Sequence, residues 1–369
     1  MRKWRVFVGV LVRKLLPAGI TRMLYWFHDI RRTAAEDVMD RTYLVEQLHG
    51  QTTRGRFLFV LVATIACTTG VVVAGFGQWG DVQPASHRPR RSVLTRSAPP
   101  VISPLPEAPS SAPVDGLIDV GGYNLYLHCI GSGQPTVVLE NGLPGTAQVW
   151  SLVQPVVAHT TRVCAYDRAG AGRSDPGSRP RTSQTLVHDL HRLLERARVA
   201  PPYILVGYSF GGLNVRVFTG QYPRDVVGVV LVDATHEDQQ ARFLAVLPPE
   251  SPVEDAGLEA FRTMLTEEWE DAAANPEGVT FAASAAQVGA AGTLGDRPFE
   301  VLTASQHGFP HAVAPAAEAA WQAMQLELAQ LSSRGSQVIL DQVGHCIPCE
   351  QPATVIAAIK RVVKAVQQP

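Results

Sequence analysis

The chain has 369 residues, of which 46% are hydrophobic and 18% are charged, which is enough for one large core with appended segments. Its formal net charge of −1 excludes the basic character expected of a nucleic-acid-binding protein. The charges are unevenly distributed, because residues 1–56 contain 11 Lys and Arg residues against 5 Asp and Glu residues. We interpret residues 1–56 as a basic cytoplasmic head.

Residues 57–77 form the first predicted element, an apolar run without any charged side chain. A helix of this length, at about 1.5 Å per residue, matches a bilayer hydrocarbon core of about 30 Å. Arg54 and Arg56 precede the run, which lies too far from the N-terminus for a secretory signal peptide. The pattern predicts a single transmembrane helix with an exported C-terminal part, and a buried core helix is the alternative. A C-terminal part on the cytoplasmic side is the other possible orientation, because basic residues also follow the span: Arg88, Arg90, Arg91 and Arg96.

Residues 78–113 carry eight prolines, interleaved with serine and alanine. This composition favours an extended linker over a folded unit. The folded part is therefore expected to occupy residues 114–369.

Beyond the linker, short apolar runs alternate with segments of helical periodicity, such as residues 182–199 and 355–366. Strands that alternate with helices predict a mostly parallel, doubly wound α/β sheet under helical cover. The predicted strands are residues 124–130, 136–140, 161–166, 203–206, 226–232, 299–303 and 337–341.

Residues 234–298 interrupt this alternation with a helical stretch at 256–274 and a tract of small residues at 282–295. Long unstructured loops are uncommon inside compact domains. We therefore predict a helical cap over the site at about residues 234–298, with a poorly ordered surface excursion as the alternative.

The segment Gly207-Tyr208-Ser209-Phe210-Gly211 directly follows the predicted strand 203–206, and a predicted helix begins behind it. Glycines permit a sharp turn from strand to helix. Such a turn lifts a serine hydroxyl out of the sheet and places a helix N-terminus beside it. Ser209 is the predicted nucleophile.

A serine hydroxyl needs a base, and the base needs an orienting carboxylate. His345 is the predicted base, because it follows the last predicted strand and a glycine. Asp233 ends the strand 226–232 and is the predicted acid by elimination, because residues 304–309 after the next strand contain no carboxylate. Glu237 and Asp238 are its nearest rivals.

An acyl-transfer site also needs donors for the developing oxyanion. The backbone N–H of Phe210, next to the nucleophile, is one candidate. The second is the N–H of Leu143, in the turn that follows the strand 136–140, where Pro144 cannot donate.

Residues 166–175 form a glycine-rich segment after a strand. It has neither the third glycine nor the opening helix of a dinucleotide loop, so we expect no cofactor there. We interpret Asp167 and Arg168 as a structural pair that fixes this loop.

Together these segments resemble the α/β-hydrolase fold family, in its serine hydrolase branch. The resemblance covers residues 114–369 in the family's order of Ser, acid and His. Two features depart from the family: Asn141 stands where a histidine is common, and Asp233 matches only members whose acid follows the preceding strand. The matching segments are residues 141–145, 166–174, 207–212, 344–345 and 351–352.

The resemblance implies a membrane-anchored serine hydrolase that cleaves an ester or related acyl bond of a small-molecule substrate through an acyl-enzyme, without a cofactor. A proline iminopeptidase-like peptidase is one alternative, and it would need an amine-binding carboxylate in the cap. The other alternative is a non-catalytic, tethered binding module. The cap carboxylates that keep the peptidase open are Glu254, Glu259, Glu267 and Glu268.

The resemblance also implies that the strands carrying Cys129 and Cys164 are neighbours. We expect two buried free thiols there, since a disulfide would need Cα atoms within ~7 Å of each other. Cys346 and Cys349 are either a local disulfide or two free thiols, because a lone C-x-x-C offers too few ligands for a structural zinc.

Overall fold

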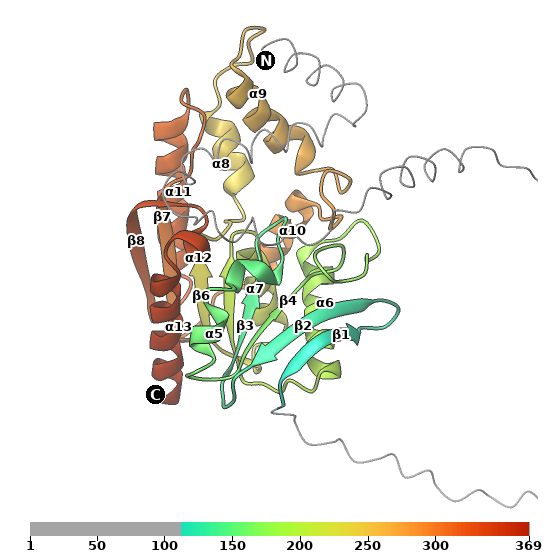
Figure 1. Cartoon of the computed structure of the whole chain (residues 1–369). Helices are drawn as coiled ribbons and strands as arrows, with labels where there is room; N and C mark the ends of the chain where they lie inside the picture. Colours follow the sequence, from blue (N-terminus) through green and yellow to red (C-terminus); the bar gives the residue numbers. More distant parts are fainter. Residues whose placement is uncertain (1–111, 369) are drawn as a thin grey trace, which may run out of the picture. The chain divides into compact units, whose positions relative to one another are not determined.

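A computed structural model describes residues 112–368 of the chain (Figure 1). The predicted basic head, the predicted membrane span at 57–77 and nearly all of the predicted linker lie outside these residues. No helix among residues 112–368 has the length and apolar character needed to cross a bilayer. The span at 57–77 therefore remains a prediction from the sequence.

One eight-stranded sheet organises the described residues, in the order β1-β2-β4-β3-β5-β6-β7-β8. The strands from β3 to β8 run parallel, while β2 is antiparallel to both β1 and β4. The predicted mostly parallel α/β sheet is confirmed. The strands are β1 (Val114–Asp119), β2 (Asn124–Ile130), β3 (Thr136–Glu140), β4 (Val163–Tyr166), β5 (Tyr203–Tyr208), β6 (Val226–Val232), β7 (Phe299–Gln306) and β8 (Gly335–Gly344).

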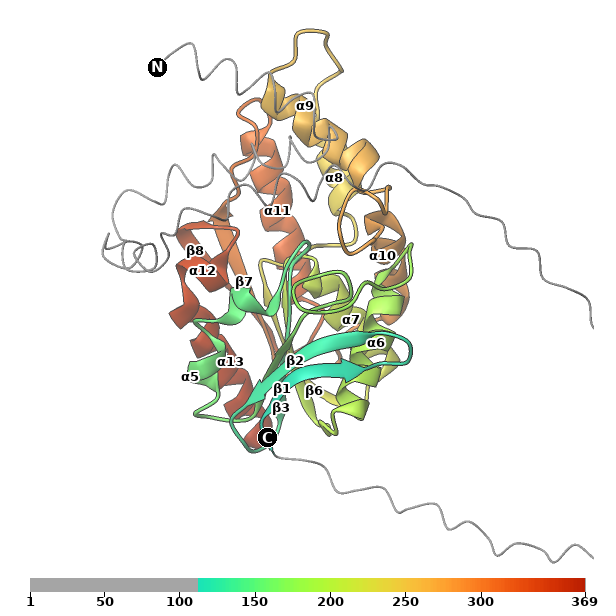
Figure 2. The ribbon, with the colours of Figure 1, turned by 45° about the vertical axis from the view of Figure 1, so that its right-hand side comes forward.

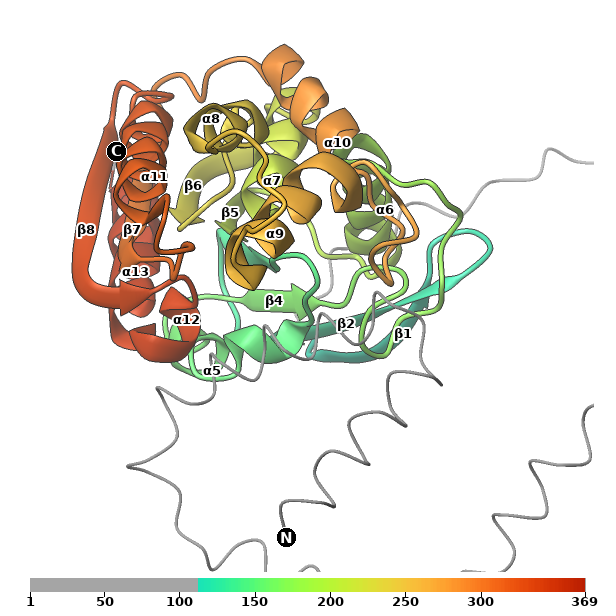
Figure 3. The ribbon, with the colours of Figure 1, turned by 90° about the horizontal axis from the view of Figure 1, so that it is seen from above.

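Helices cover both faces of this sheet (Figures 1 and 3). On one face α6 and α7 pack the strands into a core that includes the predicted helical leucines, such as Leu190 and Leu193. On the other face α5, α12 and α13 enclose a second core, with Val355 and Ile359 buried as the helical spacing predicted. The helices of these layers are η1 (Ala147–Trp150), α5 (Gln154–Val157), α6 (Ser183–Arg196), α7 (Gly211–Gln221), α12 (Ile347–Glu350) and α13 (Pro352–Gln367).

The segment between β6 and β7 folds into short helices that lie beyond the strand ends (Figure 2). After β7, helix α11 (Ala314–Ala329) packs against β7 and against α8. Phe243 of α8 and Trp321 of α11 share a small apolar cluster outside the two main cores. The helices of the inserted segment are α8 (Gln239–Val246), α9 (Ala256–Thr263), the π-helical turn η2 (Met264–Glu268), α10 (Phe281–Val288) and η3 (Gly289–Ala291).

The expectation of free thiols at Cys129 and Cys164 is wrong, because the two residues form a buried disulfide with an S–S distance of 2.08 Å. They lie directly opposite each other in the antiparallel pairing of β2 with β4, with Cα atoms 4.0 Å apart. The resemblance implies that these strands are neighbours, but it does not give their register, and the register decides which residues lie opposite each other. Cys346 and Cys349 also form a disulfide, one of the two alternatives left open.

Candidate active site

Ser209 occupies a strained turn between β5 and α7. Its φ of 53° lies in the left-handed region that side chains rarely adopt. The flanking positions require glycine because the backbone of other residues approaches them closely. A Cβ on Gly207 would lie 2.7 Å from the Gly211 carbonyl oxygen, and a Cβ on Gly211 would lie 2.6 Å from the Asn141 carbonyl oxygen. The turn is held by the Ser209 carbonyl, which accepts from the N–H groups of Gly212 and Thr235, both at 2.9 Å. The segment therefore forms the expected sharp strand-to-helix turn.

The structure brings together the three side chains predicted to form a triad. His345 Nε2 lies 2.9 Å from Ser209 Oγ, and His345 Nδ1 lies 2.6 Å from Asp233 Oδ2. The three residues follow β5, β6 and β8, whose carboxyl ends share one edge of the parallel sheet. An ionised carboxylate can only accept, so Nδ1 carries the proton and Nε2 is free to accept the serine hydroxyl.

Asp233 is fully buried, and its carboxylate is held by four donors. Oδ1 accepts from the Ala304 N–H at 3.0 Å and from Trp321 Nε1 at 2.9 Å. Oδ2 accepts from His345 and also from His307 Nε2 at 2.8 Å. Burial favours the neutral acid, but the hydrogen bonds from the two histidines outweigh it and hold the pKa of Asp233 well below its ordinary range.

The rival acids are engaged elsewhere. Glu237 binds Arg216, with contacts that include one of 2.8 Å, and the pKa of Glu237 is lowered to about 2. Burial opposes this shift, and the Arg216 guanidinium outweighs burial. Asp238 is exposed and accepts from Arg242 at 3.4 Å. Asp233 is the carboxylate that reaches the His345 ring.

The two predicted oxyanion donors border the same serine. A Cβ placed on Gly142 would lie 3.0 Å from Ser209 Cβ, so the turn that carries Leu143 packs directly against the nucleophile. Phe210 is the residue after the serine. Among residues 112–368, no turn or loop backbone hydrogen bond uses the N–H of Leu143 or of Phe210. Their assignment as oxyanion donors stays a prediction.

Arg168 is buried and binds the backbone of the turn that carries Leu143. It donates to the carbonyl oxygens of Asn141 at 2.8 Å and of Gly142 at 2.5 Å. The same guanidinium binds Glu140 at 2.7 Å and, from the inserted segment, Glu277 at 2.5 Å. Burial would lower the pKa of Arg168, but the two carboxylates outweigh it and raise the pKa above its ordinary value.

Asp167 and Arg168 do not form the pair that the sequence suggested. Asp167 instead accepts from the backbone N–H groups of Ala147 at 2.7 Å and Arg173 at 2.9 Å. The two neighbours therefore fix different loops, Asp167 the glycine-rich loop and Arg168 the Asn141–Gly145 turn.

Sequence reasoning missed three residues around the triad acid: His307, Glu318 and Trp321. His307 follows β7, in the segment where the fold family often has its acid, and its side chain binds Asp233. The only available signal was a histidine next to Gly308 at the carboxyl edge of the sheet. Glu318 and Trp321 are three residues apart on α11 and therefore share one helical face.

Among residues 112–368, two groups of side chains have metal-ligand types within mutual reach: Asp233, His307 and His345, and His236, Asp238 and Glu327. In the first group both imidazoles already bind Asp233, and in the second Arg242 occupies Glu327. A metal ion would have to displace these contacts in either group.

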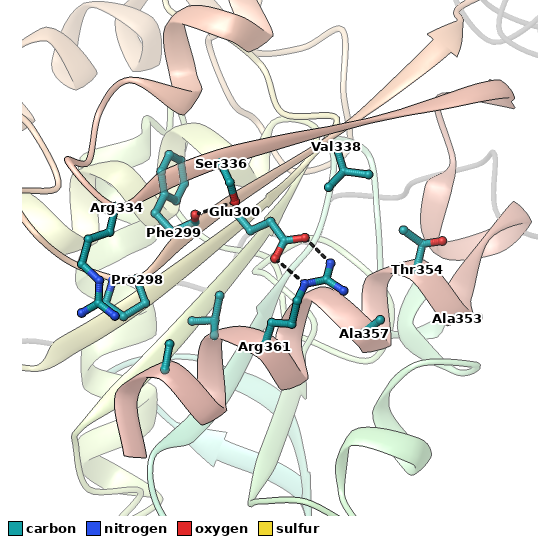
Figure 4. Close-up of a pocket in the computed structure, with 12 residues that line it drawn as sticks. Pro298, Phe299, Glu300, Arg334, Ser336, Val338, Ala353, Thr354, Ala357 and Arg361 are labelled. Atoms are coloured by element: carbon teal, nitrogen blue, oxygen red, sulfur yellow. Dashed lines mark hydrogen bonds and ion pairs between the residues drawn. The ribbon is translucent and has the colours of Figure 1, made fainter. Parts of the chain in front are cut away.

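A groove of about 660 Å³ lies along the flank of α13, away from the triad (Figure 4). Its lining includes Phe299 and Ser336, at the amino ends of β7 and β8. Glu300 and Arg361 form an ion pair across it, with Arg361 Nε 3.0 Å from the carboxylate. None of the triad residues lines this groove.

Comparison with known proteins agrees with this architecture. Residues 135–290 match a family model described as alpha/beta hydrolase fold. The chain is similar in structure to "a putative lipase (lip1) from Acinetobacter baumannii AYE", with a TM-score of 0.51 and 20% sequence identity. The superposition covers 70% of this chain and 93% of the lipase chain. The chain has the α/β-hydrolase fold.

Sequence relatives match only part of the α/β-hydrolase domain. An AB hydrolase superfamily protein of Gibberella zeae is 38% identical over 108 residues, which cover 28% of this chain and 34% of that protein. An "uncharacterized vacuolar membrane protein" of Saccharomyces cerevisiae is 31% identical over 122 residues, which cover 31% of this chain and 19% of that protein. The chain thus spans about a third or less of the length of these relatives.

Within the α/β-hydrolase fold, the region matched by the family model contains Ser209 and Asp233 but ends before His307 and His345. The positions of the two histidines therefore rest on the structure of this chain.

Proposed function

We propose that this chain is a membrane-anchored serine hydrolase that cleaves an ester or related acyl bond through an acyl-enzyme intermediate. The observation that carries the proposal is the continuous path of hydrogen bonds from Ser209 Oγ through the His345 ring to the Asp233 carboxylate. A hydroxyl, an imidazole and a buried carboxylate in this order are the components of nucleophilic acyl transfer.

In the proposed acylation step, His345 Nε2 takes the hydroxyl proton while Ser209 Oγ attacks the substrate carbonyl carbon. Asp233 keeps the proton on Nδ1 and stabilises the imidazolium that forms. The Leu143 and Phe210 N–H groups would receive the oxyanion, beside the N-terminus of α7. Losing one such donor typically costs about 3 kcal/mol of transition-state stabilisation.

The tetrahedral intermediate then collapses as His345 donates its proton to the leaving oxygen, which leaves an acyl ester on Ser209. Water, deprotonated by the same Nε2, attacks the carbonyl carbon of this ester. The second tetrahedral intermediate collapses as His345 returns the proton to Ser209 Oγ, which regenerates the serine and releases the acid. Every proton transfer in this sequence uses side chains of this chain, so the proposed reaction needs no cofactor.

Aromatic side chains near the triad support a substrate with an apolar part. The Trp321 ring lies 5.9 Å from the His345 ring, and it stacks at 6.1 Å with Phe243 of the inserted segment. Phe309 and Phe261 extend this cluster, with ring centroids 5.8 Å apart. Phe243 and Trp321 are themselves almost completely buried, so this cluster makes the surroundings of His345 apolar, which favours a substrate with an apolar group.

The peptidase alternative gains little support from the cap carboxylates. Glu254 is bound by Arg262 through both of its carboxylate oxygens. Glu259, Glu267 and Glu268 are exposed on the inserted segment. An ester substrate, which requires no amine-binding carboxylate, fits this arrangement better.

Membrane attachment is proposed from the apolar run at residues 57–77 and its basic flank. The disulfides Cys129–Cys164 and Cys346–Cys349 support a hydrolase domain on the exported side, because disulfides persist in oxidising compartments.

The proposed activity is tested by labelling the full-length protein with a phosphonofluoridate probe. The wild type should be labelled, and Ser209→Ala should not. Ser333→Ala, at an exposed serine, is the matched control and should be labelled like the wild type. Equal labelling of the wild type and Ser209→Ala would reject Ser209 as the nucleophile.

A further inference from the structure

A second histidine binds the triad acid. His307 Nε2 lies 2.8 Å from Asp233 Oδ2, the same oxygen that His345 Nδ1 contacts. The other ring nitrogen, Nδ1, lies 2.9 and 3.0 Å from the two carboxylate oxygens of Glu318. The His307 side chain is only 5% exposed and the Asp233 carboxylate is fully buried, whereas the Glu318 side chain is 28% exposed.

The chemistry of these partners fixes the protonation of His307. Ionised carboxylates accept hydrogen bonds and cannot donate them, so both ring nitrogens of His307 must carry protons. Burial would lower the pKa of His307, but the hydrogen bonds and charges of Asp233 and Glu318 outweigh burial and raise the pKa. The two carboxylates on either side of the ring therefore favour the imidazolium form of His307.

We propose that His307 is a positioning residue of the triad. Glu318 holds His307 in its charged form, and the charged His307 fixes the Asp233 carboxylate and offsets the negative charge of that carboxylate. This inference rests on the proposed function, in which His345 is the base. His307 donates one of the four hydrogen bonds that orient Asp233. Its positive charge also faces the His345 ring, with ring centroids 6.1 Å apart. A cation at this distance repels a second positive charge on the His345 ring.

Ionisable groups from four segments surround the two histidines. Asp233 follows β6, Glu318 lies on α11, and Tyr208 ends β5 with its ring 5.1 Å from that of His345. Glu350 of α12 accepts from the Gly344 N–H, next to His345 after β8. Burial raises the pKa of Tyr208, so this side chain stays neutral. Loss of the His307 charge would therefore leave carboxylates as the principal charges facing the base.

The test compares the pH dependence of kcat/KM for hydrolysis of a p-nitrophenyl ester by the full-length protein. His307→Gln retains an N–H donor for Asp233 but cannot carry the charge. The acidic limb of the pH profile of kcat/KM should therefore move to higher pH by about one pH unit in this variant. This size follows from the Coulomb interaction of unit charges about 6 Å apart at a partly exposed site. Glu318→Gln removes the carboxylate that holds His307 in its charged form, so its acidic limb should also move to higher pH. The double variant should resemble His307→Gln, because the charge on His307 is already absent there.

A residue that only packs against the triad would lower kcat/KM equally at every pH, without moving the limb. Unchanged limbs in His307→Gln and Glu318→Gln would therefore overturn the inference. If His307→Gln fails to fold, Glu318→Gln decides alone, and an unchanged or downward-shifted limb contradicts the proposal. Glu327→Gln, on the same helix but bound to Arg242, is the matched control and should keep the wild-type limb.

Ser209→Ala separates this inference from the proposed function. Activity that survives in Ser209→Ala would reject the serine hydrolase itself. Loss of activity in Ser209→Ala, together with unmoved limbs in the His307 and Glu318 variants, would reject only the role of His307.

Discussion

Asp233 shows how single residues organise this site. A carboxylate that is fully buried without partners would be neutral, because burial strongly disfavours its charge. Here four donors satisfy both oxygens, and the pKa of Asp233 is lowered despite complete burial. The ionised carboxylate in turn fixes the tautomer of His345, which leaves Nε2 directed at Ser209. The reactivity proposed for Ser209 therefore depends on residues that never touch the substrate.

The raised pKa of His307 predicts a specific dependence of stability on pH. Because the pKa in the folded state exceeds that in the unfolded state, the stabilisation is fully present below the ordinary value of about 6.5 and is lost as pH rises through the raised pKa. The melting temperatures of wild type and His307→Gln should therefore differ most in the acidic range and converge toward alkaline pH. Thermal unfolding followed across that range measures the difference. A gap that widens as the pH rises would contradict the imidazolium assignment.

At this scale the sequence predicts residues whose role depends on local pattern. Ser209 is marked by its glycine neighbours and His345 by its place after the last strand. Asp233 could be predicted because residues 304–309 contain no competing carboxylate. The role of His307 could not be predicted, since it depends on the distance between the ends of two strands and on Glu318, which lies on another element.

At the scale of elements, Arg168 links three segments that are distant in sequence. It follows β4, it holds the carbonyl oxygens of the Asn141–Gly145 turn, and it binds Glu277 of the inserted segment. The three charged side chains Arg168, Glu140 and Glu277 are almost completely buried. The position of the proposed oxyanion donor Leu143 is therefore coupled to the anchoring of the inserted segment.

Glu277→Gln should weaken both fold and activity. Arg168 keeps its ion pair with Glu140 in this variant, so the loss comes from the charge-assisted hydrogen bonds to Glu277 and is expected to be about 2 kcal/mol of stability. The oxyanion turn should loosen as well, so kcat should fall more than KM rises. Thermal unfolding and ester kinetics measure the two effects. Glu270→Gln, at an exposed carboxylate of the same segment, is the matched control, and a similar loss in that variant would refute the role of the buried cluster.

Helices and strands can be predicted where the apolar pattern of the sequence is strong. Features that depend on how strands pair are harder to predict. The strands β2, β3 and β6 begin and end where their apolar runs predict. β1 (Val114–Asp119) was not predicted, because it is a short edge strand that contains two aspartates and a glycine. The Cys129–Cys164 disulfide was mispredicted because it depends on the register of β2 against β4, which the apolar pattern does not specify.

At the scale of the whole molecule, the chain combines an α/β-hydrolase domain with a predicted membrane span and a proline-rich linker. A linker of 36 residues could hold the active site away from the bilayer surface. Such tethering would concentrate the proposed enzyme near substrates that are themselves in or near the membrane.

Deletion of residues 57–77 should release the protein from membranes. The full-length protein should sediment with membranes and resist extraction by high salt, because insertion of the span is hydrophobic and is not screened by ions. The deletion variant should appear in the soluble fraction. Ser209→Ala is the control for fractionation and should stay with the membranes. A deletion variant that still sediments after the salt wash would contradict an anchor at this position.

The measurement that tests the central claim most directly is the location of the covalent adduct after phosphonofluoridate treatment. We predict that peptide mapping by mass spectrometry finds one phosphonylated residue, Ser209, in the wild-type protein. An adduct on a different residue, or a catalytically active protein that forms no adduct, would contradict the account.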